Sequence, residues 1–238
     1  MKKSISIFLF CITTSLFAQD AWVSFKNETV LEMNTIPGWC STEKALLMMD
    51  IIKENKCQHC IEVGVFSGMS LFPIAKALQY NGSGKVSAID AWDPLEAIKG
   101  FSSSDPNYVW WSQLDFNYFY RQTLTLINKN KLNKFCSIIK QSSQNATRLF
   151  VDDTIDFIHL DGNHNEEFAF QDVINYFPKV KDGGYILLND PNWFSMKRAL
   201  VFLLERADVI SSFSPSATYL LFRKNNQRMQ NANVLFNN

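Results

Sequence analysis

Two short motifs in the second half of the chain combine carboxylates with a histidine. Asp161-Gly-Asn-His164 follows one apolar run, and Asn189-Asp190 follows the next. If the two runs are neighbouring parallel strands, their ends lie about 5 Å apart and Asp161 and Asp190 open onto one spot. Two carboxylates so close repel each other unless a proton or a cation lies between them. Because oxygen-rich sites favour Mg²⁺, Mn²⁺ or Ca²⁺, the motifs predict a divalent-metal site, to which Asn189 adds a carbonyl ligand.

A structural interpretation of these residues stays open beside the metal site. Asp161 and Asp190 would then cap loops, and His164 would cap the helix that follows it. His159, inside the preceding apolar run, is interpreted as a core histidine with its hydrogen bonds satisfied rather than as a ligand.

A second constellation lies nearer the N-terminus, in the sequence Glu62-Val-Gly64-Val-Phe66-Ser-Gly68. Glycines let the backbone turn tightly and approach a ligand closely, and the helix that begins here presents free N–H groups. Asp90 stands at the end of the next apolar run, where a carboxylate can hold two ribose hydroxyls. The two features at successive strand ends predict a nucleoside site, with a tight turn and a capping aspartate as the alternative.

The elements that must position these residues follow from the hydrophobic pattern. Strands are predicted at 60–65, 85–90, 135–140, 155–161 and 185–189, with closing strands at 209–211 and 217–223. Helices are predicted from an N-cap at 41–44 to about 53, and at 69–80, 113–128, 144–150, 166–177 and 195–206. Residues 21–37 are expected to form an arm over the substrate side, and 92–112 a long active-site loop. This alternation predicts a Rossmann-like α/β fold, an open and mostly parallel sheet with helices on both faces and the ligand site at the carboxyl ends of the strands.

The composition and the first residues of the chain indicate the number of domains, the kind of partner and the location of the protein. The chain has 238 residues with 23 basic and 23 acidic side chains, which predicts one domain and argues against nucleic acid as the main partner. Lys2 and Lys3, the apolar run 5–17 and the polar return after Ala18 have the order of a secretory signal. The expected division is a signal-like segment 1–18, a domain 19–224 with an arm 19–40, and a flexible tail 225–238. We expect an exported protein, periplasmic or secreted, or a protein anchored to the membrane by this segment; a buried N-terminal element and a cytoplasmic location stay open.

The glycine loop resembles that of the class I S-adenosylmethionine-dependent methyltransferases, over roughly residues 38–205. The matching pattern is E-[IV]-G-x-[FY]-x-G-x-S, at Glu62, Gly64, Phe66, Gly68 and Ser70. The resemblance implies S-adenosylmethionine as cofactor, with Gly64 and its neighbours at its amino-acid portion and Asp90 at its ribose. It further implies that Trp92 flanks the adenine, unless it is a packing aromatic, and that Ser142 contacts the base.

The D-G-x-H motif is similar to that of the metal-dependent O-methyltransferases, most of all the sugar-modifying type. The resemblance implies that Asp161, Asn189 and Asp190 hold Mg²⁺ or another divalent cation, and that His164 is the general base beside Asp161. One acidic residue of the family pattern is replaced by Asn189, which puts the metal affinity in question. The aromatic residues in and after the loop 92–112 are expected to close over the acceptor: Trp110, Trp111, Phe116 and Tyr118. For Phe116 and Tyr118, the packing face of a helix is the alternative.

The sequence therefore predicts methyl transfer to a hydroxyl of a small molecule, such as a sugar. Two alternatives remain: an aminopropyl-transferring enzyme with the same cofactor pocket, and an exported binding or effector protein that keeps the fold without activity. The second alternative arises because the cofactor is made in the cytosol. The acceptor and the oligomeric state are not encoded in any motif that we can interpret.

Overall fold

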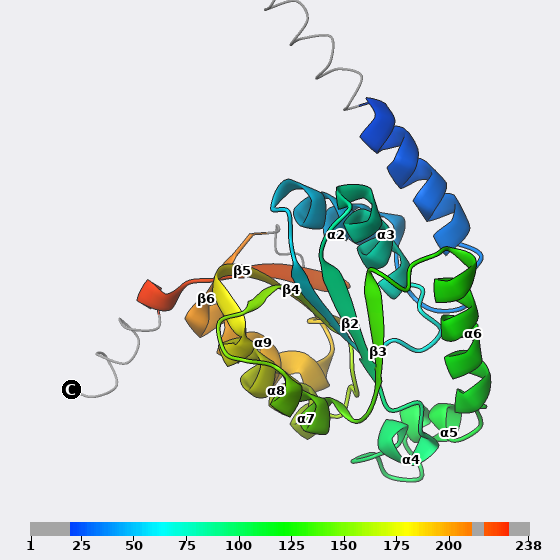
Figure 1. The fold of residues 1–238 in the computed structure, drawn as a ribbon. Coiled ribbons are helices and arrows are strands. Elements are labelled where there is room, and N and C mark those ends of the chain that lie inside the picture. Colours follow the sequence, from blue (N-terminus) through cyan, green and yellow to red (C-terminus); the bar gives the residue numbers. More distant parts are fainter. Residues whose placement is uncertain (1–19, 211–216, 229–238) are drawn as a thin grey trace, which may run out of the picture.

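The computed structural model describes residues 20–210 and 217–228, whose strands form a seven-stranded sheet in the order β3-β2-β1-β4-β5-β7-β6 (Figure 1). The strands are β1 (His59–Val63), β2 (Lys85–Asp90), β3 (Cys136–Lys140), β4 (Ile155–Leu160), β5 (Val180–Asn189), β6 (Ala207–Val209) and β7 (Tyr219–Lys224). Strands β1 to β5 pair in parallel, and β7 is antiparallel to both β5 and β6. The predicted open α/β architecture is confirmed, because strands and helices alternate along the chain as the pattern indicates.

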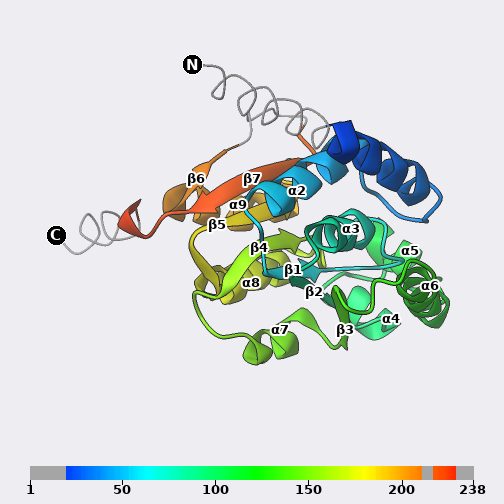
Figure 2. The same ribbon diagram turned by 45° about the horizontal axis from the view of Figure 1, so that its top comes forward.

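Helices cover both faces of the sheet (Figure 2). One face carries α2 (Thr42–Glu54), α3 (Leu71–Asn81) and α6 (Phe116–Lys129), and the other carries α7 (Ser143–Ala146), α8 (Glu166–Tyr176) and α9 (Lys197–Arg206). Short helical turns are α4 (Pro94–Ala97), α5 (Pro106–Trp111), η1 (Thr147–Leu149), η2 (Phe177–Lys179) and η3 (Phe194–Met196). Successive strand residues face opposite layers: Phe157 packs with α2 and α3, and Ile158 packs with α8. This double burial explains why the strands are near-continuous apolar runs.

The predicted long loop 92–112 contains two short helices, which the sequence interpretation missed. Both begin with the dipeptide Asp-Pro: Asp93 caps α4 and Asp105 caps α5, each accepting a hydrogen bond from the backbone N–H two residues on. Proline suits the first helical position because its missing N–H is not needed there. The dipeptides were the signal for these helices.

Residues 20–33 are helical and lie outside the helix layer rather than over the substrate side. Trp22 donates its indole N–H to Asp50 of α2 at 2.7 Å and contacts Tyr80 of α3, while Glu32 accepts from Asn130 after α6. The part of the predicted arm that reaches the site is therefore 37–40.

Of the two segments that flank the predicted domain, the structure describes only residues 225–228. The signal-like segment 1–18 lies outside the described residues, and within them no helix is both long enough and apolar enough to cross a membrane. Residues 226–228, in the predicted tail, are helical, and Arg228 donates to the Ala207 carbonyl at 2.8 Å. Residues 229–238 of that tail lie outside the described residues.

Candidate functional site

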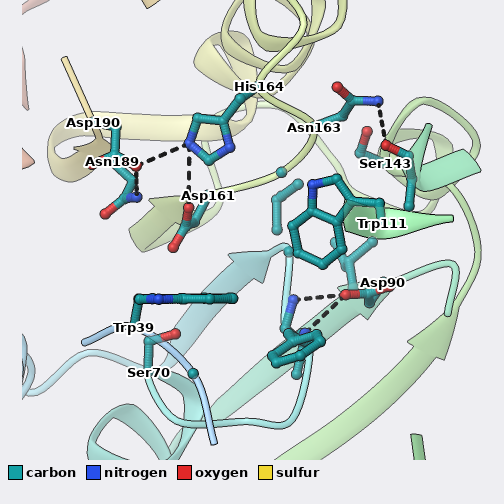
Figure 3. A pocket seen from close by; sticks show the side chains of 18 of the residues that line it. Trp39, Ser70, Asp90, Trp111, Ser143, Asp161, Asn163, His164, Asn189 and Asp190 are labelled. Atoms are coloured by element: carbon teal, nitrogen blue, oxygen red, sulfur yellow. Dashed lines mark hydrogen bonds and ion pairs between the residues drawn. The ribbon is translucent and has the colours of Figure 1, made fainter. Parts of the chain in front are cut away.

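A cavity of about 820 Å³ opens at the carboxyl ends of the strands. Its volume lies in the upper range of small-molecule sites, which leaves room for a cofactor and a small acceptor. The predicted residues that line it are Gly64, Phe66, Ser70, Asp90, Ser142, Asp161, His164, Asn189 and Asp190. Figure 3 shows that the polar residues come from two groups of strand ends, with Asp90 and Ser143 on one side and Asp161, His164 and Asp190 on the other.

The conformation of the glycine loop between β1 and α3 is determined first by the close packing of two strand ends. At Gly64 φ is +84°, and a Cβ added there would lie 1.9 Å from the carbonyl oxygen of Asp161. Only glycine allows the end of β1 to approach the end of β4 so closely. The next residue but one, Phe66, has φ of +54°, a conformation that bulky side chains rarely adopt. The loop is therefore held in one strained shape at the cavity wall.

Asp90 holds this loop in place. One carboxylate oxygen accepts from the backbone N–H groups of Val65 and Phe66, both at 2.9 Å, and the other accepts from Trp92 N–H at 2.7 Å. Burial raises the pKa of Asp90, although the three backbone donors act against the rise. A carboxylate can accept about four hydrogen bonds, so Asp90 keeps acceptor capacity towards the cavity that it lines.

Three of the predicted cofactor residues, Glu62, Gly68 and Trp92, lie behind the cavity wall rather than in it. Glu62 is fully buried; it accepts from the Ser70 hydroxyl and lies 3.1 Å from Nδ1 of His159. Trp92 is buried too, and its indole N–H donates to the Phe66 carbonyl at 2.7 Å. The structure gives these residues a supporting role in shaping the loop.

Burial favours the neutral forms of both Glu62 and His159. Burial raises the pKa of Glu62 to about 8, against the hydrogen bond from Ser70 that lowers it. Burial, together with the charge of Lys44, lowers the pKa of His159 well below its ordinary value. A protonated carboxyl beside a neutral imidazole avoids burying an ion pair. His159 is buried as predicted, but its Nε2 makes no hydrogen bond among the described residues, so the expectation that its hydrogen bonds are satisfied is wrong for that atom.

Ser142 lines the cavity at the start of α7, together with Ser143 and Gln144. Ser143 and Gln144 both donate to Oδ1 of Asp172, a buried residue of α8 that the sequence interpretation did not single out. Burial raises the pKa of Asp172 to about 7. This aspartate links the segment after β3 to the helix after β4.

On the other side of the cavity, the sheet brings the two acidic motifs together as predicted. Strands β4 and β5 are neighbours, with Leu160 opposite Leu188. Nε2 of His164 lies 3.7 Å from Oδ1 of Asp161 and 3.3 Å from Oδ2 of Asp190 (Figure 3). One potential ligand atom from each of these three residues lies within 4.8 Å of the others.

The electrostatics of this group reflect burial and mutual attraction. Burial raises the pKa of Asp161 and Asp190 adds to the rise, whereas Lys44 and His164 lower it. Burial also disfavours the charged form of His164, but the carboxylates of Asp190 and Asp161 outweigh it and raise its pKa. His164 and Asp161 therefore attract each other, while burial opposes the charge on both.

The donor set fits a divalent cation in part. Two carboxylates and an imidazole converge on one spot, and such oxygen and nitrogen ligands suit Mg²⁺, Mn²⁺ and similar ions. Asn189 does not present its carbonyl oxygen as the predicted ligand. Its Oδ1 accepts from Nζ of Lys44 at 2.8 Å, and its Nδ2 donates to Asp190 at 2.9 Å. The amide therefore presents N–H groups, and not its oxygen, to the carboxylates.

Three residues that line the cavity escaped the sequence interpretation: Lys44 and Trp193 on this side, and Trp39, whose ring stacks on Phe66 of the glycine loop. A signal for Lys44 existed, because it shares the apolar face of α2 with Met48 and Ile51, and a lysine at such a position calls for a buried partner. Trp193 lies against the His164 ring, with ring centroids 4.9 Å apart. Nothing in the local sequence marks either tryptophan.

The predicted aromatic residues divide between the wall and the surface. Trp110, Trp111 and Phe116 line the cavity, whereas Tyr118 is exposed and does not. Phe66 contacts the two tryptophans, with ring centroids 6.3 and 5.8 Å away. These rings form an apolar side of the cavity near the glycine loop.

The sheet order, the glycine loop and the acidic strand ends together define a class I methyltransferase fold. The chain belongs to a methyltransferase-domain family, whose model matches residues 61–191, more than half of its length. A search of the curated proteins finds no match.

Solved structures of methyltransferases share the fold at low sequence identity. The SAH-bound methyltransferase PaMTH1 of Podospora anserina has a TM-score of 0.58 at 11% identity, over 89% of this chain and 95% of its own. An O-methyltransferase of Bacillus cereus in complex with SAH has a TM-score of 0.56 at 11% identity, over 86% and 90%. The O-methyltransferase TomG of Streptomyces achromogenes, involved in tomaymycin synthesis and in complex with SAM, has a TM-score of 0.55 at 12% identity, over 79% and 82%. At these identities the likeness shows the fold alone.

Proposed function

We propose that this protein transfers a methyl group from S-adenosylmethionine to a hydroxyl of a small acceptor, with a divalent cation at Asp161 and Asp190. The observation that carries the proposal is the placement of two complementary groups in one cavity. The glycine loop and Asp90 stand at one side, and the Asp161–His164–Asp190 cluster stands at the other. A nucleoside site alone would leave the second cluster without a role.

The cofactor side is suited to a nucleoside with an amino-acid tail. Asp90 retains acceptor capacity for ribose hydroxyls, and Ser142 lines the same cavity at the start of α7. S-adenosylmethionine bound here would supply the electrophilic methyl group. The chain's part in the reaction is then to hold the acceptor oxygen in line with that methyl, and most of the rate enhancement would come from this positioning.

The acidic side is suited to an ionising hydroxyl. A divalent cation held by Asp161 and Asp190 would supply charge that stabilises the alkoxide of the acceptor. His164 is placed to take the hydroxyl proton at Nε2, which makes no hydrogen bond among the described residues. Because the neighbouring carboxylates raise the pKa of His164 above 6.5, its basic form grows as the pH rises, so kcat/KM should increase with pH through that raised value.

The aromatic walls suit a small acceptor rather than a polymer. Trp39 and Trp110 lie with ring centroids 5.2 Å apart and narrow the cavity between the loop at 37–41 and α5. Trp193 flanks His164. With an acceptor bound between them, such rings would exclude water from the reacting atoms and so strengthen the electrostatic interactions there.

The test is calorimetric titration of S-adenosylmethionine into the full-length chain, followed by an acceptor screen that detects S-adenosylhomocysteine release with Mg²⁺ or with EDTA. Cofactor binding together with metal-dependent release from a hydroxylated acceptor would support the proposal. Absence of binding at millimolar cofactor would sink it and favour a binding or effector protein. Polyamine formation from the decarboxylated cofactor would favour aminopropyl transfer instead.

A further inference from the structure

Lys44 is a buried lysine that reaches from α2 to the ends of β4 and β5. It is 4% exposed. Its Nζ lies 2.8 Å from Oδ1 of Asn189, 3.5 Å from the Trp39 carbonyl oxygen and 3.9 Å from Oδ2 of Asp161. A buried ammonium group is costly unless such oxygens surround it. These contacts account for the position of the lysine, and none of them is to its own helix.

The contact between Lys44 and Asn189 determines how the amide is turned. An ammonium group only donates hydrogen bonds, so it requires the oxygen of Asn189. The amide nitrogen then faces the other way and donates to Oδ2 of Asp190 at 2.9 Å. The reversed amide would set N–H groups against the ammonium and its oxygen against a carboxylate, so the network admits one orientation.

The effect of Lys44 therefore extends to the atom that His164 also approaches. Oδ2 of Asp190 lies 3.3 Å from Nε2 of His164 and accepts from Asn189. Asp190 has φ of +45°, so its backbone is held in an unusual conformation as well. A chain of direct contacts runs from Lys44 through Asn189 to Asp190.

We propose that Lys44 is a positioning residue that acts through Asn189: it turns the amide oxygen away from the two carboxylates and thereby fixes Asp190. This inference rests on the proposed metal-assisted function. The cation site is then built from Asp161 and Asp190 without the Asn189 oxygen, and the charge of Lys44 weakens its attraction for a divalent cation.

Two substitutions separate orientation from charge. Lys44→Met loses both the donor and the charge, whereas Lys44→Gln loses the charge but keeps an N–H donor for Asn189. Lys53→Met, on the same helix but against Trp22 and outside the cavity, is the matched control. Melting temperatures of all three variants show whether each one folds.

The first measurement is made without metal, on the side-chain amide of Asn189 by ¹⁵N NMR, assigned by its loss in Asn189→Ala. We expect its hydrogen exchange to be protected in the wild type, in Lys44→Gln and in Lys53→Met. In Lys44→Met it should accelerate by about five- to tenfold, the effect of one lost hydrogen bond. Equal protection in Lys44→Met would overturn the proposal.

The second measurement is calorimetric titration of Mn²⁺ into the same proteins. Lys44→Met should bind Mn²⁺ at least about tenfold more tightly than the wild type, because a like charge is removed and the Asn189 oxygen is freed. Lys44→Gln should gain less, and a lower melting temperature with unchanged Mn²⁺ affinity would show a merely structural role and overturn the proposal. If the wild type binds no Mn²⁺ while the amide responds as expected, the metal-assisted function fails and the positioning role of Lys44 stands.

Discussion

The two sides of the cavity are built in different ways. The glycine-loop side is held by the backbone: Gly64 and Phe66 have positive φ, and Asp90 accepts three backbone N–H groups. The acidic side is held by side chains that carry charge, and in it Nε2 of both His159 and His164 lacks a hydrogen bond among the described residues.

This difference separates what folding completes from what a ligand completes. Backbone hydrogen bonds at the glycine loop form as the sheet forms, so that side is shaped before any ligand arrives. In a buried cluster of ionisable side chains, the free energy of interaction changes whenever a proton or a cation binds. We therefore expect substitutions at the loop to change stability or cofactor affinity, and substitutions at the acidic cluster to change the chemistry.

The largest effect is expected for Gly64→Ala. The new methyl group would meet the Asp161 carbonyl oxygen at 1.9 Å, so the ends of β1 and β4 must separate. We expect a loss of more than about 4 kcal/mol in the free energy of unfolding, measured with urea. Gly82→Ala is the matched control: it too has positive φ, but nothing lies within 4 Å of the added atom, and a loss of about 1 kcal/mol is expected. Equal losses would show that strain alone, and not the strand approach, explains Gly64.

The next effect is expected for Asp161→Asn at the acidic cluster. Loss of this carboxylate removes one of the two acidic ligands of the proposed cation. It also removes the ion pair with Lys44, in which Nζ and Oδ2 of Asp161 lie 3.9 Å apart. We expect kcat/KM to fall by roughly 10²- to 10³-fold while the affinity for S-adenosylmethionine, measured by calorimetry, stays near that of the wild type.

The control for this experiment lies on the same strand. Asp156→Asn changes a carboxylate at the opposite end of β4, where it accepts from the backbone N–H groups of Gln58 and His59. We expect it to lower stability and to leave kcat/KM intact. A matching loss of activity in the two variants would remove the distinction between the acidic cluster and the rest of the strand.

A smaller effect is expected for Asp90→Asn. The amide would place N–H groups against the backbone donors of the loop, and one charged acceptor would be lost from the cavity. We expect the dissociation constant for S-adenosylmethionine to rise by about ten- to a hundredfold. Asp115→Asn, which keeps the capping oxygen of α6 outside the cavity, should bind the cofactor as the wild type does. Unchanged affinity in Asp90→Asn would mean that the cofactor does not use this carboxylate.

An effect on stability that depends on pH is expected at Asp172, which links the two sides. Burial raises its pKa to about 7 from 3.8, so the folded protein keeps a proton between about pH 4 and 7 that the unfolded chain has lost. Stability from this group is thus present at low pH and declines as the pH rises towards 7. Asp172→Asn retains the acceptor for Ser143 without the titration. Its stability relative to the wild type should increase over this range by up to about 4 kcal/mol, because one unit of pKa shift corresponds to about 1.4 kcal/mol. Urea unfolding at several pH values measures this difference, and a difference that does not vary with pH would contradict the assignment.

The sequence alone predicted most of the frame. The strand ends at Asp90, Asp161 and Asn189 were placed within a residue or two, because the apolar runs and their polar successors are local properties of the chain. The convergence of Asp161 and Asp190 could be predicted from these strand ends, because neighbouring parallel strands bring their carboxyl ends together. The Asp-Pro starts of α4 and α5 were local signals too, and were missed.

The tertiary structure decided which hydrogen-bond or ion-pair partner each polar atom contacts. Lys44 and Asn189 are 145 residues apart in the chain, so no local pattern predicts that the amide oxygen is turned to the lysine and away from the cation site. Glu62 and Trp92 match or flank the family motif, yet packing places them behind the cavity wall. Hydrophobic periodicity determines which elements form and which faces they bury. The orientation of a buried amide or carboxyl depends on every donor and charge that packing brings within a few ångströms, and that sum exists only in the folded protein.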